Sequence, residues 1–299
     1  MRKLLVLLFV FSFSNVWSQD SIENSNINKY TPSKLLEKGR WDIKWFNNLY
    51  TQVRGVDENR NISRLKRSNF LNTSLEVFTG ITANKKINIG IIGEFRSNTI
   101  NGANAFSVFQ FKTSPNSARA GFGHIAPSIK IAPFSKISNL SFQSSFFIPT
   151  FSTETSNGVF LSQKSFIWQN RAFYDYTFKG RKFQLFTELG TRLFLGEKQF
   201  DGNGTLNNKG GFANNSIEIS PGVFFSYFPT NKFTVLALVQ HSQLVKISNN
   251  FTQNFTAVGG GVKLQVSRAI NLEAIYSNFV RGNSSGLGQS FNLGMRTIL

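Results

Sequence analysis

The stretch LNTSLEVFTGITANKKINIGIIGEF, Leu71 to Phe95, decides the fold. Apolar and polar residues alternate from Leu71 to Ile81 and again from Ile87 to Phe95, and the sequence ANKK at residues 83–86 lies between the two runs. Alternation with a period of two is typical of a β-strand whose two faces meet different surroundings. The stretch therefore predicts two strands joined by a short basic turn.

Four further short connections also contain at least one Lys or Arg and no acid: Ser135-Lys136, Lys179-Gly180-Arg181-Lys182, Thr230-Asn231-Lys232 and Ser267-Arg268. Between them lie longer loops, at Asp57–Arg64, Ser97–Ala118, Ser152–Lys164 and Gly196–Gly211. Short turns at one end and long loops at the other are typical of a transmembrane β-barrel, with the turns on the periplasmic side. Either the turn bases contact anionic lipid headgroups, or they are basic only because turns are exposed to water.

The alternating segments predict an all-β protein, a single antiparallel up-and-down barrel of about 12 strands. The segments are Trp41–Arg54, Leu71–Ile81, Ile87–Phe95, Ile125–Ile131, Leu140–Ile148, Phe166–Phe178, Phe183–Leu195, Ile217–Tyr227, Phe233–Val245, Val258–Val266, Ile270–Val280 and Phe291–Leu299. Pro127, Pro149 and Pro221 conflict with this pattern, because proline cannot donate to the ladder. We expect bulges or later strand starts at these prolines, and a bend in the wall at Gly259-Gly260-Gly261.

The N-terminal residues predict export. Met1-Arg2-Lys3 and the apolar run Leu4 to Phe13 indicate a signal peptide over residues 1–18. Residues 19–40 are expected to form a periplasmic tail, in which Pro32 to Lys38 is either a short helix or an extended lead-in. The barrel then occupies residues 41–299, in the outer membrane of a Gram-negative bacterium.

Composition excludes several classes of function. The net charge of +18 would suggest nucleic acid in a soluble protein, but an exported chain is not expected to bind it. With no cysteine and two histidines, we expect no disulfide, metal or cofactor. His124 and Ser128 stand about 13 Å apart along a strand, and His241 and Ser242 face opposite sides. We therefore expect no enzymatic activity.

The polar faces of the predicted strands carry seven acids and seven bases, so the lumen is expected to be neutral. The acids are Asp42, Glu76, Glu94, Asp175, Glu188, Glu218 and Glu273, and the bases are Lys44, Arg96, Lys130, Arg171, Arg192, Lys263 and Arg296. Glu94/Arg96, Arg171/Asp175 and Glu188/Arg192 are two or four residues apart on one face. These charges form either a structural lattice of ion pairs or a selectivity filter along a polar pathway.

Both ends of the barrel region resemble uncharacterised outer-membrane β-barrels of the Bacteroidetes type. The resemblance rests on Tyr276 to Arg296, on Gly39-Arg40-Trp41-Asp42 with Phe46 to Tyr50, and on the Val16-Trp17-Ser18-Gln19 junction. It implies a fold and a location but no reaction. The sequence departs from many such barrels in ending on Thr297-Ile298-Leu299 rather than on an aromatic residue.

These observations predict a narrow conduit for small hydrophilic solutes. The alternative is a closed structural or partner-binding barrel in an envelope assembly, with the outer loops and the N-terminal tail as contact surfaces. In either case outer-membrane lipids surround the barrel. Bases of the outer rim are expected to meet lipid phosphates: Arg60, Arg64, Lys66, Arg67, Lys112 and Arg119.

Overall fold

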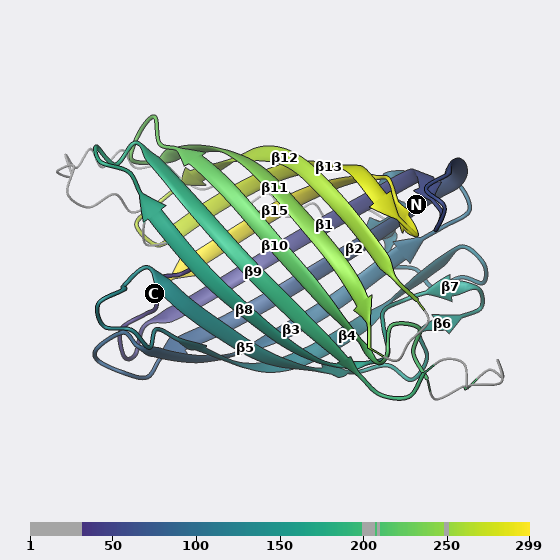
Figure 1. Cartoon of the computed structure of the whole chain (residues 1–299), viewed down its shortest axis with the longest axis horizontal. Coiled ribbons are helices and arrows are strands. Elements are labelled where there is room, and N and C mark those ends of the chain that lie inside the picture. Colours follow the sequence, from purple (N-terminus) through teal and green to yellow (C-terminus); the bar gives the residue numbers. More distant parts are fainter. Residues whose placement is uncertain (1–31, 199–206, 208–209, 248–250) are drawn as a thin grey trace, which may run out of the picture.

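The computed structural model describes residues 32–198, 207, 210–247 and 251–299, and the predicted signal peptide lies outside them. Twelve long strands form one closed antiparallel sheet, since β1 pairs with both β2 and β15 (Figure 1). This confirms the predicted all-β barrel of twelve strands. The strands are β1 (Trp41–Val56), β2 (Ile62–Gly80), β3 (Ile87–Thr99), β4 (Ala118–Ile131), β5 (Leu140–Pro149), β8 (Phe166–Thr177), β9 (Phe183–Leu195), β10 (Ser216–Tyr227), β11 (Phe233–Lys246), β12 (Gln253–Gln265), β13 (Ile270–Asn283) and β15 (Gln289–Ile298).

Four short elements lie in the loops between these strands: a 3-10 turn, η3 (Ala105–Gln110), the two-residue strands β6 (Thr155–Ser156) and β7 (Val159–Phe160), and β14 (Ser285–Gly286). β6 and β7 form a small hairpin at the loop end of the barrel (Figure 1). Within the described residues, no helix has the length and apolarity needed to cross a membrane.

The two ends of the barrel differ in their connections. Five short turns and the C-terminus lie at one end, the turn end, where the Trp41 amide donates to the Leu299 carbonyl at 3.0 Å. The loops after β1, β3, β5, β9, β11 and β13 lie at the other, the loop end. β9 has the predicted bounds, but β2 begins at Ile62, nine residues earlier than expected. In β2, pairing with β1 extends back to Ile62, beyond the part of the strand in which apolar and polar residues alternate.

The outer face of the barrel is apolar. In β9, Leu189 is 49% exposed while Phe186 on the opposite face is 8% exposed. Trp45 and Trp168 are also about half-exposed on this outer face. Because no water reaches a bilayer core, only a closed barrel or a helix can satisfy its backbone there. The apolar belt and the closed sheet together place the protein in the outer membrane.

Two prolines interrupt the wall without shifting its register. Pro127 pairs with Ile91 of β3, but pairing between β4 and β5 stops after Ile125 and resumes at Ser128. Around Pro221, pairing between β10 and β11 likewise stops at Ile219, which pairs with Gln243, and resumes at Gly222, which pairs with Gln240. Neither site has a bulge at the proline or a later strand start, contrary to expectation. At each proline, pairing is interrupted with only one of the two neighbouring strands.

The glycine run in β12 lets the backbones of β12 and β13 approach each other closely. A Cβ added at Gly259 or Gly261 would collide with the Tyr276 or Ala274 carbonyl oxygen of β13. The wall is therefore tight at this point, which is what glycine within a strand commonly permits.

Candidate functional site

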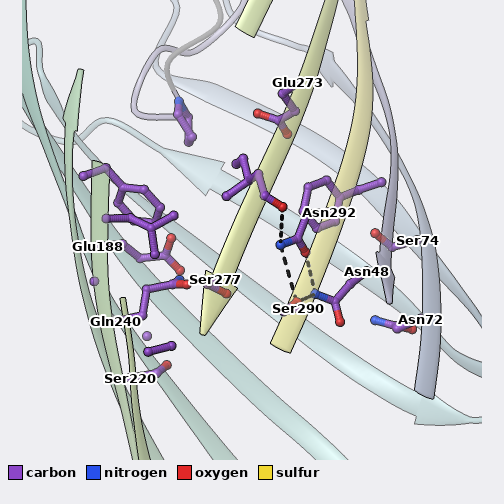
Figure 2. Close-up of a pocket in the computed structure, with 18 of the residues that line it drawn as sticks. Asn48, Asn72, Ser74, Glu188, Ser220, Gln240, Glu273, Ser277, Ser290 and Asn292 are labelled. Carbon is purple, nitrogen blue, oxygen red and sulfur yellow. Dashed lines mark hydrogen bonds between the residues drawn. The ribbon is translucent and has the colours of Figure 1, made fainter. Parts of the chain in front are cut away.

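The barrel encloses a cavity of about 680 Å³. Side chains of strands from both halves of the wall point into it, including Glu188, Gln240, Glu273 and Asn48 (Figure 2). This volume lies within the range of small-molecule sites. The lumen is therefore a candidate site for a small solute.

Ten of the fourteen charged residues predicted for the lumen line this cavity: Lys44, Glu76, Glu94, Arg96, Arg171, Glu188, Arg192, Glu218, Lys263 and Glu273. The other four occupy positions on the same inward faces near the turn end: Asp42, Lys130, Asp175 and Arg296. Their side chains are buried or only slightly exposed.

Ion pairs form mostly between strands rather than along them. Arg171 Nε lies 2.7 Å from Glu188 Oε1, and Arg192 Nη1 lies 3.7 Å from Glu218 Oε2. Sequence spacing instead predicts partners four positions away, Asp175 for Arg171 and Glu188 for Arg192. Four residues along a strand span about 13 Å, whereas neighbouring strands are about 5 Å apart. Strand register, which the sequence did not reveal, therefore selects the partners.

The remaining lumen bases near the turn end also contact a carboxylate or an aromatic ring. Arg296 Nη2 lies 2.7 Å from Asp42 Oδ2, and Lys263 Nζ lies 3.0 Å from Glu273 Oε2. Lys44 is 3.9 Å from the other oxygen of Glu273. Lys130 places its ammonium 3.9 Å from the centre of the Phe78 ring, in a cation–π contact.

Glu94 joins one pair that sequence spacing predicted and one that it missed. Its carboxylate lies 3.4 Å from Arg96 Nη2 and 3.2 Å from His124 Nδ1. His124 is 30 residues away, but β3 and β4 are neighbours. The imidazole is 3% exposed and packs edge-on against Phe147 and Phe151. It is therefore enclosed by apolar rings.

Uncharged amides and hydroxyls form a second polar group in the lumen (Figure 2). The Asn48 amide donates to Ser290 Oγ at 2.5 Å, and the Asn292 amide donates to the Ile275 carbonyl at 3.3 Å. Asn72 and Ser74 of β2 lie nearby. Sequence reasoning considered only charges and missed this group, although the same inward parity would have identified it.

Aromatic rings form another part of the lumen wall. Phe255 and Phe279 stack with centroids 4.4 Å apart, and Tyr50 lies 4.8 Å from Phe279. Phe186 and Phe224 form a further pair, 5.5 Å apart. All five rings line the cavity. The lumen is therefore not uniformly hydrophilic, because charged and aromatic areas share it.

Loops cover part of the loop end from within. The β6–β7 hairpin buries Val159 and Leu161, and the Asn98 side chain donates to the Phe160 and Leu161 carbonyls at 2.7 and 2.9 Å. Ala213, from the loop after β9, is fully buried in an apolar cluster with lumen-facing side chains. Rings from three loops also pack in series, Phe160 on Phe212 and Phe212 on Phe251.

Glu154 fastens two of these loops together. Its carboxylate accepts hydrogen bonds from the Lys164 amide at 2.8 Å and the Phe212 amide at 3.1 Å. Arg119 of β4 donates to the carbonyls of Thr153 and Glu154 at 2.8 and 2.7 Å. Burial raises the pKa of the Glu154 carboxyl, although the two amides oppose this shift. The Glu154 carboxylate thus links the loop after β5 to the loop after β9.

The turn end is crossed by residues 32–40, here called the lead-in segment. It contains no helix in its described residues, so the extended alternative is correct. Ser33 is 1% exposed and donates its hydroxyl to Asp175 of β8, and Lys34 Nζ lies 3.5 Å from the same carboxylate. The Leu36 amide donates to Asn88 of β3 at 3.2 Å. From the start of β1, the segment therefore extends across the mouth of the barrel and binds β3 and β8.

Comparison with solved structures shows the fold. The chain is similar to an outer membrane channel from Pseudomonas putida F1, with a TM-score of 0.69 and 8% identity over 90% of this chain and 98% of that one. The β domain of the Bordetella autotransporter BrkA gives 0.48 and 12% over 86% and 98%. The NanC porin gives 0.46 and 10% over 84% and 98%. No family model and no curated protein matches the chain.

At such low identity the likeness concerns the fold alone. It agrees with the closed sheet, the apolar outer face and the unequal ends of the barrel described above. The chain is therefore a twelve-stranded β-barrel of the outer-membrane kind, located in the outer membrane of a Gram-negative bacterium.

Proposed function

We propose that this barrel is a narrow conduit for small hydrophilic solutes, including those that also carry an apolar group. The cavity of about 680 Å³ inside the sheet is the observation that supports this function. Its lining offers both fixed charges and aromatic rings. A solute with a polar and an apolar side would be matched on both walls.

The paired charges would then act as a filter. Arg192 is the most accessible of the lumen arginines in these pairs, with 43% of its side chain exposed, and its distance to Glu218 is the longest of the arginine pairs. A loosely paired, hydrated guanidinium can exchange its partner for the charge of a passing solute. Arg171 and Arg296, with carboxylates at 2.7 Å, would instead hold the wall together.

Single-channel recording in a planar bilayer tests the conduit directly. With Arg192→Gln, loss of a lumen base is expected to move the reversal potential toward cation selectivity, and Glu218→Gln, which removes the acid of the same pair, should move it the opposite way. Lys179→Gln is the matched control, because Lys179 is an exposed base in a turn outside the lumen. No openings from folded, inserted protein, in wild type and in Asp175→Asn alike, would contradict the conduit.

The second candidate is a closed structural or partner-binding barrel of an envelope assembly. Two observations favour it: the ring packing at Phe212 and the lead-in contacts of Ser33. In that function the outer loops and the N-terminal tail would contact a protein partner. Neutralising Arg192 would then lower stability without any change in conductance.

Other expectations follow from the sequence. We infer a signal peptide over residues 1–18, a periplasmic tail over 19–40 and the barrel over 41–299. Kinship with barrels of the Bacteroidetes type remains a prediction. We expect no enzymatic activity. Nδ1 of His124 lies 3.2 Å from the Glu94 carboxylate and the ring packs against Phe147 and Phe151, while Nδ1 of His241 is hydrogen-bonded to Thr256.

A further inference from the structure

The loop between β3 and β4 folds against the outer wall of the barrel instead of over the mouth. Val108 of η3 is fully buried and packs with Leu49 and Leu71. These two leucines alternate with lumen-facing residues and so lie on the outer face of β1 and β2. The Ser97 hydroxyl donates to the Val108 carbonyl at 2.6 Å and fixes η3 in place.

The wall beneath this loop also carries a group of polar side chains. Thr51, Asn69, Ser97 and Thr99 share the outward parity of their strands, and all are at most 7% exposed. The Asn69 amide donates to the Ala103 and Asn104 carbonyls at 3.1 and 3.2 Å. Polar groups facing lipid are costly unless they are hydrogen-bonded. The loop therefore seals a polar area of the wall.

The opposite face of the same loop is aromatic and exposed. Phe106 is 71% exposed, Phe109 48% and Phe111 53%. Phe111 contacts Phe95 at 5.6 Å, and Phe95 contacts Phe122, which is 72% exposed, at 5.5 Å. The surface formed by these five rings, here called the phenylalanine face, is continuous with the lipid-facing wall.

The segment of chain that contains the phenylalanine face carries bases and no acid. No acid occurs in the sequence between Glu94 and Glu154. Lys112 directly follows Phe111 and is exposed. Arg67 lies under the loop, where its carbonyl accepts from the Gly102 amide at 3.0 Å and its guanidinium donates to Thr51 Oγ1 at 3.2 Å. Aromatic rings with adjacent bases are typical of segments that lie in the interface of a bilayer with anionic headgroups.

We propose that the phenylalanine face is a docking surface for phosphorylated lipids of the outer leaflet. Its five rings enter the acyl-chain boundary, and Lys112 meets lipid phosphates. This contact holds η3 against the wall and keeps the polar area beneath it dry. A second copy of the chain is the competing occupant, and the test separates the two.

The absence of cysteine allows single-site labelling of the full mature chain. Phe109→Cys and Asn157→Cys, an exposed position on the β6–β7 hairpin, are each labelled with an environment-sensitive fluorophore and reconstituted in vesicles. Position 109 is expected to emit at shorter wavelength and to be quenched about five-fold less by iodide than position 157. Unheated gel mobility confirms that each variant is folded.

Two further arms identify the occupant. Replacing part of the phosphatidylcholine with phosphatidylglycerol should increase the protection at position 109, and Lys112→Gln should remove that increase. Equal quenching at positions 109 and 157 would overturn the proposal. Protection that disappears when the protein is diluted tenfold in lipid would also overturn it, because a second copy would then be the occupant.

Discussion

At the turn end of the barrel, the lead-in segment binds Asp175 through the Ser33 hydroxyl and the Lys34 ammonium. At the loop end, Phe160, Phe212 and Phe251 pack ring against ring. The first closure is a small number of polar contacts made by a segment outside the sheet. The second is an apolar cluster continuous with the barrel interior. The difference suggests that the turn end opens more easily, because few contacts must break and water can replace them.

Loss of a buried ion pair at the turn end is expected to have the largest effect. Arg296→Met leaves Asp42 without its bidentate partner, with side-chain exposures of 12% and 7% in the native pair. We expect a loss on the order of 3–5 kcal/mol in the free energy of unfolding. Urea titration followed by tryptophan fluorescence measures it. Asp42→Asn combined with Arg296→Met should recover part of the loss, and equal losses in both proteins would contradict this explanation.

Release of the lead-in segment is the next largest effect. Asp175→Asn weakens its contacts with Ser33 and Lys34, so the segment should leave the mouth more often. Single-channel conductance or open probability is expected to rise several-fold, about what the loss of 1–2 kcal/mol of closure would give. Lys179→Gln is the control, because Lys179 is an exposed base in the turn after β8 and lies outside the lumen. If the two variants conduct alike, the lead-in segment does not limit flow.

Disruption of the aromatic series tests the loop end. Phe212→Ala removes two edge-to-face ring contacts, at 5.8 and 5.5 Å. Each such pair contributes about 0.5–1.5 kcal/mol beyond area burial. The loops should therefore become sensitive to external protease while the barrel stays resistant. A conductance increase as large as that of Asp175→Asn would show that both ends close with similar strength.

The smallest effect is the pH dependence at Glu154. Because burial raises its pKa in the folded loop, the protonated form contributes stability that is fully present below the unfolded pKa. That stability is lost as pH rises through the folded pKa, by less than about 1 kcal/mol after solvent screening. Hydrogen exchange at the Lys164 and Phe212 amides, corrected for intrinsic rate, should show better protection at low pH. Glu154→Gln should remove the dependence, and protection that grows with pH would contradict the sign.

The strands could be predicted from the sequence wherever apolar and polar residues alternate. β9 and the starts of β3, β5 and β13 follow the expected bounds. The polar upper part of β2 from Ile62 was missed, because no apolar period marks a strand that extends above the membrane. The wall prolines were also misjudged, since the sequence cannot show that a neighbouring ladder compensates for one missing bond.

The lumen residues were easier to name than to pair. Inward parity follows from the period of two, but the partner of a residue depends on register between strands. Glu94 and His124 meet only because β3 and β4 are adjacent, with a register shift between Gly93 and Phe95. The aromatic part of the lumen was missed for another reason. An inward phenylalanine in a barrel looks in sequence like one that faces lipid.

The interrupted ladders at Pro127 and Pro221 give the wall two mechanical seams. They separate one arc of four strands, β5, β8, β9 and β10, from the remaining eight. Because a strand pair with missing hydrogen bonds bends more easily than an intact ladder, the four-strand arc and the eight-strand arc should move as two rigid units. The four-strand arc carries the loops that hold Glu154 and Phe212. Its outward swing would widen the bore and lift the loop cover in one movement.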